Sequence, residues 1–194
     1  MRDAYLVGAA QTDFGSFPDE SYRSLFRTAF EAARDSVPAG IDPDDVDEAV
    51  VGTLGVGGRQ LGLSGPAVTE HVGLDGIPCT RVENACAASG YAVRQAVQAV
   101  KSGMADVVLA GGVEIMTDTS SDATKYWLGV SGETEWERLS GTTFAGSTPR
   151  WPTRTWKSTA RRPNTSPASR SRTTPTARKT RTPTSASSAP WRMR

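Results

Sequence analysis

Apolar and polar residues along positions 1–115 form short segments whose periodicity predicts strands and helices in turn. Apolar runs of strand length occupy residues 4–10, 48–53, 77–84 and 105–112. Apolar residues recur at helical spacing within residues 21–37, 65–72 and 86–102. Near-continuous apolar strands that alternate with helices are typical of a parallel or mixed sheet covered on both faces. The pattern therefore predicts an α/β fold.

Charge divides the chain into an acidic body and a basic tail. All 21 Asp and Glu residues but only nine of the 22 Lys and Arg residues lie within 1–137, so this part carries a net charge of −12. Residues 138–194 hold the other 13 basic residues and no acidic residue. The net charge of the whole chain is therefore near zero only because two large opposite charges cancel. An acidic surface most often serves solubility, and a body with only two lysines also fits a host adapted to high salt.

Residues 147–194 consist almost entirely of Thr, Ser, Pro, Ala, Arg and Lys, with three Trp residues. Such a segment buries too little apolar surface to offset its ordering entropy, so we expect it to be disordered. A basic arm with aromatic residues is one form that a nucleic-acid-binding tail takes. A frameshift explains the composition better. Codons for Asp and Glu begin with GA, and a shift of the reading frame by one base turns them into codons that begin with A, which encode Thr, Ser, Arg, Lys and Asn among others. We therefore do not favour a nucleic-acid partner.

Cys86 lies where the strand predicted at 77–84 turns into the helix predicted at 86–102. Unpaired backbone N–H groups and the positive end of the helix dipole meet at such a turn, and both favour a thiolate. Because the thiolate is the nucleophilic form, Cys86 is the candidate catalytic residue. The alternative is that a free cysteine packs as a small apolar side chain, and Cys79, inside the apolar strand, fits that interpretation better.

The other candidate motifs are weak. A single histidine, His71, and two cysteines seven residues apart do not form a metal-ligand set, so we expect no metal. The segment Gly55-Val56-Gly57 lacks the third glycine of a dinucleotide fingerprint, because position 60 is Gln60. His71 is expected to be a surface residue.

Four segments together resemble the N-terminal half of the thiolase family. The more specific pair is Arg81-Val-Glu-Asn-Ala-Cys-Ala-Ala-Ser-Gly-Tyr-Ala-Val93 and Asp106-Val-Val-Leu-Ala-Gly-Gly-Val-Glu-Ile-Met116. The weaker pair, which precedes it in family order, is Ala4-Tyr-Leu-Val-Gly-Ala-Ala-Gln-Thr-Asp-Phe-Gly15 and Asp42-Pro-Asp-Asp-Val-Asp-Glu-Ala-Val-Val-Gly52. The commoner family pattern has Ser and Gly at the second and third positions after the cysteine, where this chain has Ala88 and Ser89.

The resemblance implies a thiolase-like N-terminal half-fold over 1–115, with a mixed sheet covered by helices. It implies the start of the family's loop domain over 116–146, followed by the tail over 147–194. In such enzymes the cysteine, here Cys86, attacks an acyl-CoA to form a thioester, and Claisen condensation or thiolytic cleavage completes the reaction. Coenzyme A thioesters are then substrates, and no cofactor stays bound. Glu114, in the second motif, is expected to serve structure rather than proton transfer.

In the family, an activating histidine, a second cysteine and an oxyanion-site Asn or His all lie in the C-terminal half, which has no counterpart here. We therefore expect a truncated chain that is inactive alone. We also expect it to form a homo-oligomer or to associate with a complementary C-terminal half. In the family, the strand before the nucleophile, here 77–84, pairs across a dimer interface.

Two alternatives stay open. The chain could belong to another condensing enzyme of the superfamily, of the ketoacyl synthase or hydroxymethylglutaryl-CoA synthase type. It could also be a non-catalytic fragment or a basic-tailed nucleic-acid-binding protein. The sequence shows no secretory signal and no apolar run of membrane-spanning length, so we expect a cytoplasmic protein with no membrane partner.

Overall fold

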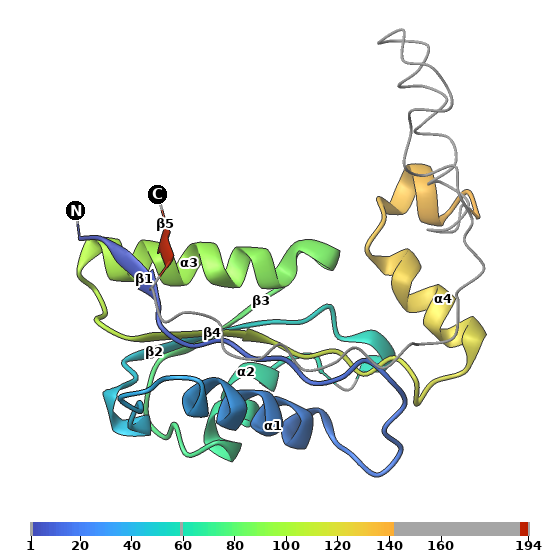
Figure 1. Cartoon of the computed structure of the whole chain (residues 1–194). Coiled ribbons are helices and arrows are strands. Elements are labelled where there is room, and N and C mark those ends of the chain that lie inside the picture. The colour runs from blue at the N-terminus through green and yellow to red at the C-terminus, as the bar shows by residue number, and fades with distance from the viewer. Residues whose placement is uncertain (1, 59, 142–190, 194) are drawn as a thin grey trace, which may run out of the picture. The chain divides into compact units, whose positions relative to one another are not determined.

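The structure, a computed structural model, describes residues 2–58 and 60–141, and the backbone of 191–193. The chain divides into one unit of residues 1–127 with 190–194 and a second unit of residues 128–189. The elements of the first unit (Figure 1) are β1 (Ala4–Leu6), α1 (Tyr22–Asp35), β2 (Glu48–Gly52), α2 (Ser64–His71), β3 (Cys79–Val82), α3 (Ala88–Ser102), β4 (Val108–Gly112) and β5 (Trp191–Met193). Helix α4 (Ser121–Val130) spans the division, and a π-helical turn, Thr134–Arg138, belongs to the second unit.

The central sheet has three parallel strands in the order β3-β2-β4. In its register, Gly52 at the end of β2 lies between Val82 of β3 and Gly112 of β4. A helix lies between consecutive strands of this sheet along the chain, as parallel connections require. The predicted α/β class is confirmed, with a sheet that is parallel throughout its described strands rather than mixed. The antiparallel pair β1–β5 forms a separate two-stranded sheet.

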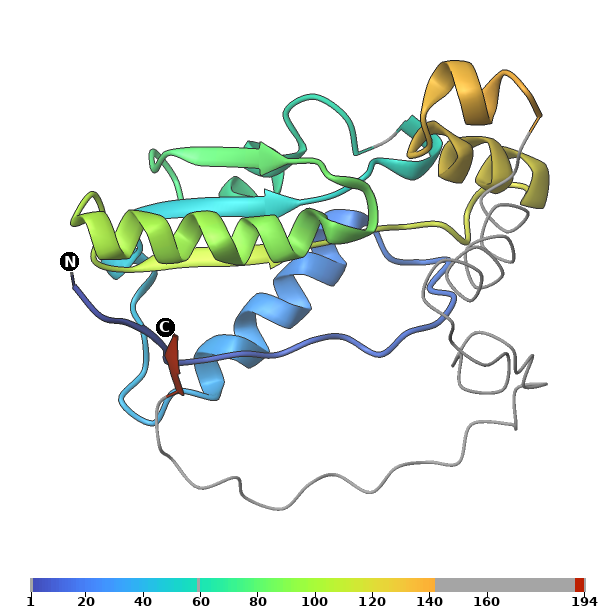
Figure 2. The same ribbon diagram turned by 90° about the horizontal axis from the view of Figure 1, so that it is seen from above.

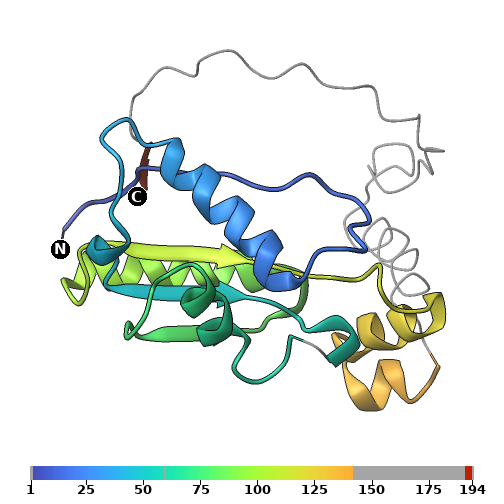
Figure 3. The ribbon, with the colours of Figure 1, turned by 90° about the horizontal axis from the view of Figure 1, so that it is seen from below.

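Helices cover both faces of the parallel sheet. Helix α3 runs along one face, while α1 and α2 lie on the other (Figures 1 and 3). The buried core on the α1 and α2 side comprises Phe26, Phe30, Val46, Val51, Val68 and Leu74. On the opposite face, α3 lies along β2 and β4 (Figure 2) and buries Ala88, Ala92, Ala96 and Ala99. These small side chains let α3 approach the sheet closely.

The predicted helices are confirmed to within two residues at each end, and a capping contact explains where α1 begins. At the start of α1, the Ser21 hydroxyl accepts the Ser24 N–H at 3.1 Å, and the Ser24 hydroxyl accepts the Ser21 N–H at 2.8 Å. This reciprocal capping satisfies two backbone donors that the helix itself leaves free. The Cys86 segment differs slightly from its prediction, because a 3₁₀ turn, Ala85–Ala87, precedes α3.

Three strands are shorter than the apolar runs that predict them by three or more residues, and β2 is shorter by one residue. Strand β1 ends at Leu6, where its pairing with β5 ends, although the run extends to residue 10. Strand β3 keeps only the middle of the run 77–84. Strand β4 begins at Val108 because the Asp47 carboxylate takes the backbone N–H groups of Asp106 and Val107, at 2.7 and 2.9 Å.

Residues 116–141 contain α4 and the π-helical turn, although the sequence shows no helical period there. Neither element buries a residue, so no apolar stripe marks them. The disorder expected over 147–194 falls almost wholly outside the described residues. The described part of this segment is the backbone of β5, a strand that the prediction did not include. Strand β5 pairs with β1 from Ala4↔Met193 to Leu6↔Trp191. Among the described helices, none is long and apolar enough to cross a membrane.

Candidate active site

Cys86 lies in the 3₁₀ turn that joins β3 to α3, and its side chain is exposed. The turn is tight, because β3 ends at Val82 and α3 begins at Ala88. Exposure excludes the interpretation of Cys86 as a buried apolar side chain. The strand-to-helix position predicted for this residue is therefore the observed one.

The residue before Cys86 has an uncommon backbone conformation. Ala85 has φ = 48°, in the left-handed region, which costs a residue other than glycine about 1–2 kcal/mol. The Glu83 carboxylate accepts the Ala85 N–H at 2.6 Å, and the Asn84 carbonyl accepts the Ala87 N–H at 2.9 Å. These two hydrogen bonds hold the turn that carries Cys86 in a bent conformation. Strain of this kind persists where surrounding contacts enforce it, often at functional sites.

The first turn of α3 lies at the carboxyl ends of the parallel strands. Gly52 and Gly112 end β2 and β4, and a Cβ atom placed on Gly52 would lie only 2.8 Å from the backbone of Ala88 and of Ser89. No side chain caps α3 at Ala87. Ligands of parallel α/β sheets bind at this edge, and helix N–H groups left without a side-chain cap favour negative charge. The site is thus suited to a thiolate and to an oxyanion.

Glu114 is a structural residue in this arrangement, as the sequence predicts. Its carboxylate accepts the backbone N–H groups of Leu54 and Val56 at 2.8 and 2.7 Å, that of Gly55 at 3.2 Å, and the Thr53 hydroxyl at 3.0 Å. One side chain therefore holds residues 53–56, the first part of the loop that follows β2.

Two further side chains hold the same loop, and the sequence does not single them out for this role. Arg81 of β3 donates to the carbonyls of Thr53 and Leu54, at 3.1 and 3.3 Å. Gln60 is buried, donates to the Val56 carbonyl at 3.3 Å and accepts the Ile115 N–H at 2.9 Å. No sequence pattern marks these contacts, because Thr53 lies 28 residues from Arg81 and Ile115 lies 55 residues from Gln60.

Cys79 and His71 lie apart from this site. Burial raises the pKa of the Cys79 thiol; a hydrogen bond from Thr69 opposes the rise, and the negative charge of Glu48 adds to it. Cys79 is half-buried in β3 and packs against Gly65 of α2. His71 ends α2, which covers the sheet face opposite α3 (Figure 1). The fold therefore does not bring His71 to Cys86.

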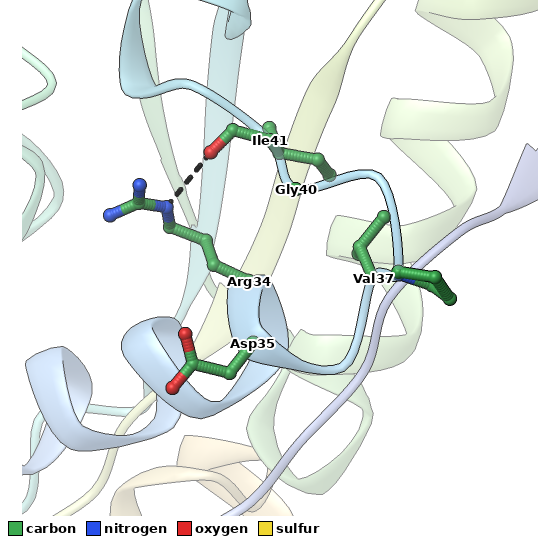
Figure 4. A pocket seen from close by; sticks show the side chains of 6 residues that line it. Arg34, Asp35, Val37, Gly40 and Ile41 are labelled. Carbon is green, nitrogen blue, oxygen red and sulfur yellow. Dashed lines mark hydrogen bonds between the residues drawn. The ribbon is translucent and has the colours of Figure 1, made fainter.

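Among the described residues, neither a metal-ligand cluster nor the hollow beside α1 contributes to the Cys86 site. The described residues contain no group of three His, Cys, Asp or Glu side chains able to hold a metal ion. A hollow of about 410 Å³ lies at the C-terminal end of α1 (Figure 4), lined by Arg34, Asp35, Val37, Pro38, Gly40 and Ile41. Arg34 Nε closes one side by donating to the Ile41 carbonyl at 3.0 Å.

Comparison with known proteins identifies the family to which the described part of the chain is similar. Residues 4–141 match the family described as thiolase, N-terminal domain. This chain belongs to the thiolase family. The match includes all of the parallel sheet, its covering helices and Cys86.

Two of the relatives are both named acetyl-CoA acetyltransferase. The one from Methanocaldococcus jannaschii is 46% identical over 147 residues, which is 74% of this chain and 36% of the relative. The one from Methanothermobacter thermautotrophicus is 38% identical over 146 residues, 74% of this chain and 37% of the relative. A non-specific lipid-transfer protein-like 2 from Caenorhabditis elegans is 35% identical over 119 residues, 60% of this chain and 27% of the relative. The chain thus spans a little over a third of the length of the two relatives named acetyl-CoA acetyltransferase.

Proposed function

We propose that this chain is the nucleophile-bearing part of a thiolase-type acyltransferase that acts on acyl-CoA through a thioester on Cys86. The observation that carries the proposal is the exposed Cys86 on a strained turn, beside the uncapped first turn of α3. Family membership and the two relatives named acetyl-CoA acetyltransferase support coenzyme A thioesters as the substrate class.

The proposed first step is a transfer between two sulfur atoms. The Cys86 thiolate attacks the carbonyl carbon of the acyl-CoA, and the resulting oxyanion is stabilised by backbone N–H groups near the start of α3. The bond from that carbon to the CoA sulfur then breaks, CoA leaves as a thiolate, and the acyl group stays on Cys86. A second CoA thioester, or free CoA, would take the acyl group in condensation or cleavage.

The second step needs acid–base groups that the described residues do not bring to Cys86. Cys79 is half-buried with a raised pKa, and His71 lies beyond the sheet. A general base must lie within hydrogen-bond reach of the proton it takes. We propose that these groups come from a complementary C-terminal half, and that this chain alone accepts one acyl group without turnover.

Two surfaces of the first unit support association with another polypeptide. Strand β3 is an edge strand of the parallel sheet, so its outer backbone edge is open to a further strand. On α3, Tyr91 and Val93 are large side chains that remain 48% and 42% exposed while the alanines are buried. We propose that β3 pairs with a second copy of the chain and that the exposed Tyr91 and Val93, on the two sides of α3, contact the complementary half.

A related condensing enzyme is the second candidate, favoured only by the small residues Ala88 and Ser89 after the nucleophile. The two candidates share the Cys86 thioester and differ in the second substrate. The match to the thiolase N-terminal family over 4–141 favours the first.

The experiment adds acetyl-CoA to the purified chain and follows released CoA with a thiol reagent, using Cys86→Ala as the control. We expect one equivalent of CoA per chain and none from the variant. Continued Cys86-dependent release would show that the chain completes the reaction unaided. Equal release from the parent and the Cys86→Ala variant would refute the proposed nucleophile.

A further inference from the structure

Gly52 and Gly112, here called the glycine pair, lie side by side at the carboxyl ends of β2 and β4 and face the first turn of α3. They are register partners in the sheet. A Cβ on Gly52 would lie 2.8 Å from Ala88 C and Ser89 N. A Cβ on Gly112 would overlap the Ser89 hydroxyl and lie 2.8 Å from the Gly52 carbonyl oxygen. Cβ atoms essentially never approach backbone this closely, so α3 occupies space that any other residue would fill.

The neighbouring glycine on β4 faces the other side of the sheet. A Cβ on Gly111 would meet the ring of Phe26, in α1, at 2.8 Å, and not α3. Successive strand residues point to opposite faces of the sheet. Alanine at Gly111 and alanine at Gly112 therefore add the same methyl group to opposite faces. Added bulk at Gly111 strains the α1 packing, whereas at Gly112 it displaces α3.

Gly52 contacts both ends of the turn that carries Cys86. Its strand partner is Val82, the last residue of β3, and its Cα faces the backbone of Ala88, the first residue of α3. Residues 83–87 must close the distance between these two ends with Ala85 in the left-handed region. A displacement of α3 relative to Val82 therefore changes the conformation of the turn, and with it the placement of the Cys86 sulfur.

We propose that the glycine pair positions Cys86, by letting α3 begin directly against the sheet so that the turn 83–87 closes in its bent form. The inference rests on the proposed role of Cys86 and adds two positioning residues that touch no substrate. It also explains why α3 begins on small residues, since Ala88 and Ser89 pack where the strand backbones have no side chains.

The test compares Gly52→Ala, Gly112→Ala and Gly111→Ala in the full chain. The readout is the rate of Cys86 alkylation by iodoacetamide across a pH series, divided by the rate for Cys79 in the same molecule, with peptide mass spectrometry separating the two. We expect the ratio to fall on the order of tenfold in Gly52→Ala and Gly112→Ala, and to stay near the parent value in Gly111→Ala. The pH profile of Cys86 should change shape in the first two variants only.

A rescue variant keeps the test decisive if the single substitutions weaken folding. Ser89→Ala removes the hydroxyl that a methyl group at position 112 would overlap and leaves the Ser89 Cβ at an ordinary 3.6 Å. The 2.8 Å approach of that methyl group to the Gly52 carbonyl oxygen remains. Adding Ser89→Ala to Gly112→Ala should recover part of the lost ratio, whereas Ser89→Ala alone should leave it unchanged. Ratios in Gly52→Ala and Gly112→Ala equal to that in Gly111→Ala would overturn the inference. A parent Cys86 no faster than Cys79 would instead refute the proposed nucleophile, whatever the variants show.

Discussion

Replacement of Glu114 by Gln should destabilise the protein by about 2–4 kcal/mol, although it changes only one oxygen to a nitrogen. Each carboxylate oxygen of Glu114 accepts at least two donors: Oε1 from Val56 and Gly55, Oε2 from Leu54, Gly55 and Thr53. The glutamine amide can accept at one oxygen only, and its NH₂ group then faces N–H donors. With the amide oxygen at the Oε2 position, the Val56 N–H loses its acceptor and meets the amide NH₂ instead. Two donors then face each other, at about 1–3 kcal/mol for each donor left unsatisfied in a partly buried site.

Urea denaturation followed by circular dichroism measures the stability change, and amide hydrogen exchange locates it. The Leu54 and Val56 amides should exchange faster in Glu114→Gln than in the parent. Glu31→Gln is the matched control, because Glu31 pairs with Arg27 on an exposed helix face and should cost only about 0.3–0.5 kcal/mol. A loss in Glu114→Gln no larger than in this control, with unchanged exchange at Leu54 and Val56, would refute the role given to Glu114.

The remaining predictions concern acid stability, cysteine reactivity and the tail. The backbone N–H groups of Val107 and Asp106 lower the pKa of Asp47 below its ordinary 3.8, so its contribution to stability is present above that pH and is lost as the pH falls through the lowered value. Asp47→Asn should therefore show a smaller loss of urea midpoint between neutral pH and pH 3 than the parent; equal losses would contradict this. Iodoacetamide near neutral pH should label exposed Cys86 faster than Cys79, whose raised pKa keeps it a thiol, and equal slow labelling would count against a reactive site. Limited trypsin digestion should cleave after Arg150 and at the basic residues beyond it, and leave a resistant piece that ends at Arg150, close to Gly146. Protection of the tail equal to that of the body would show that it is ordered.

The order of strands and helices could be predicted because burial follows the apolar period in this part of the chain. Near-continuous apolar residues mark β2, which is buried from Ala49 to Gly52, and spaced aromatics mark α1. Strand ends could not be predicted, since they depend on partners distant in sequence. The Asp47 carboxylate that takes two N–H groups before β4 is 59 residues from the nearer of them.

The position of Cys86 could also be predicted, because a strand-to-helix turn is visible in the local pattern. The strain at Ala85 could not, because alanine does not mark a left-handed residue as glycine does. The roles of Gly52 and Gly112 depend on which face of the sheet each occupies and on how closely α3 approaches. In the sequence they resemble the turn glycines nearby, and only the register separates Gly112 from Gly111.

Covalent acetylation of Cys86 is the most direct test of the proposed function. The purified chain is incubated with acetyl-CoA near neutral pH, digested under acidic conditions and mapped by peptide mass spectrometry, with Cys86→Ser as the control. We predict one acetyl group on the peptide that contains Cys86, none on the peptide that contains Cys79, and none on either peptide of the variant. Acetylation of Cys79 in preference to Cys86, or an unmodified Cys86 at saturating acetyl-CoA, would contradict the assignment of Cys86 as the nucleophile.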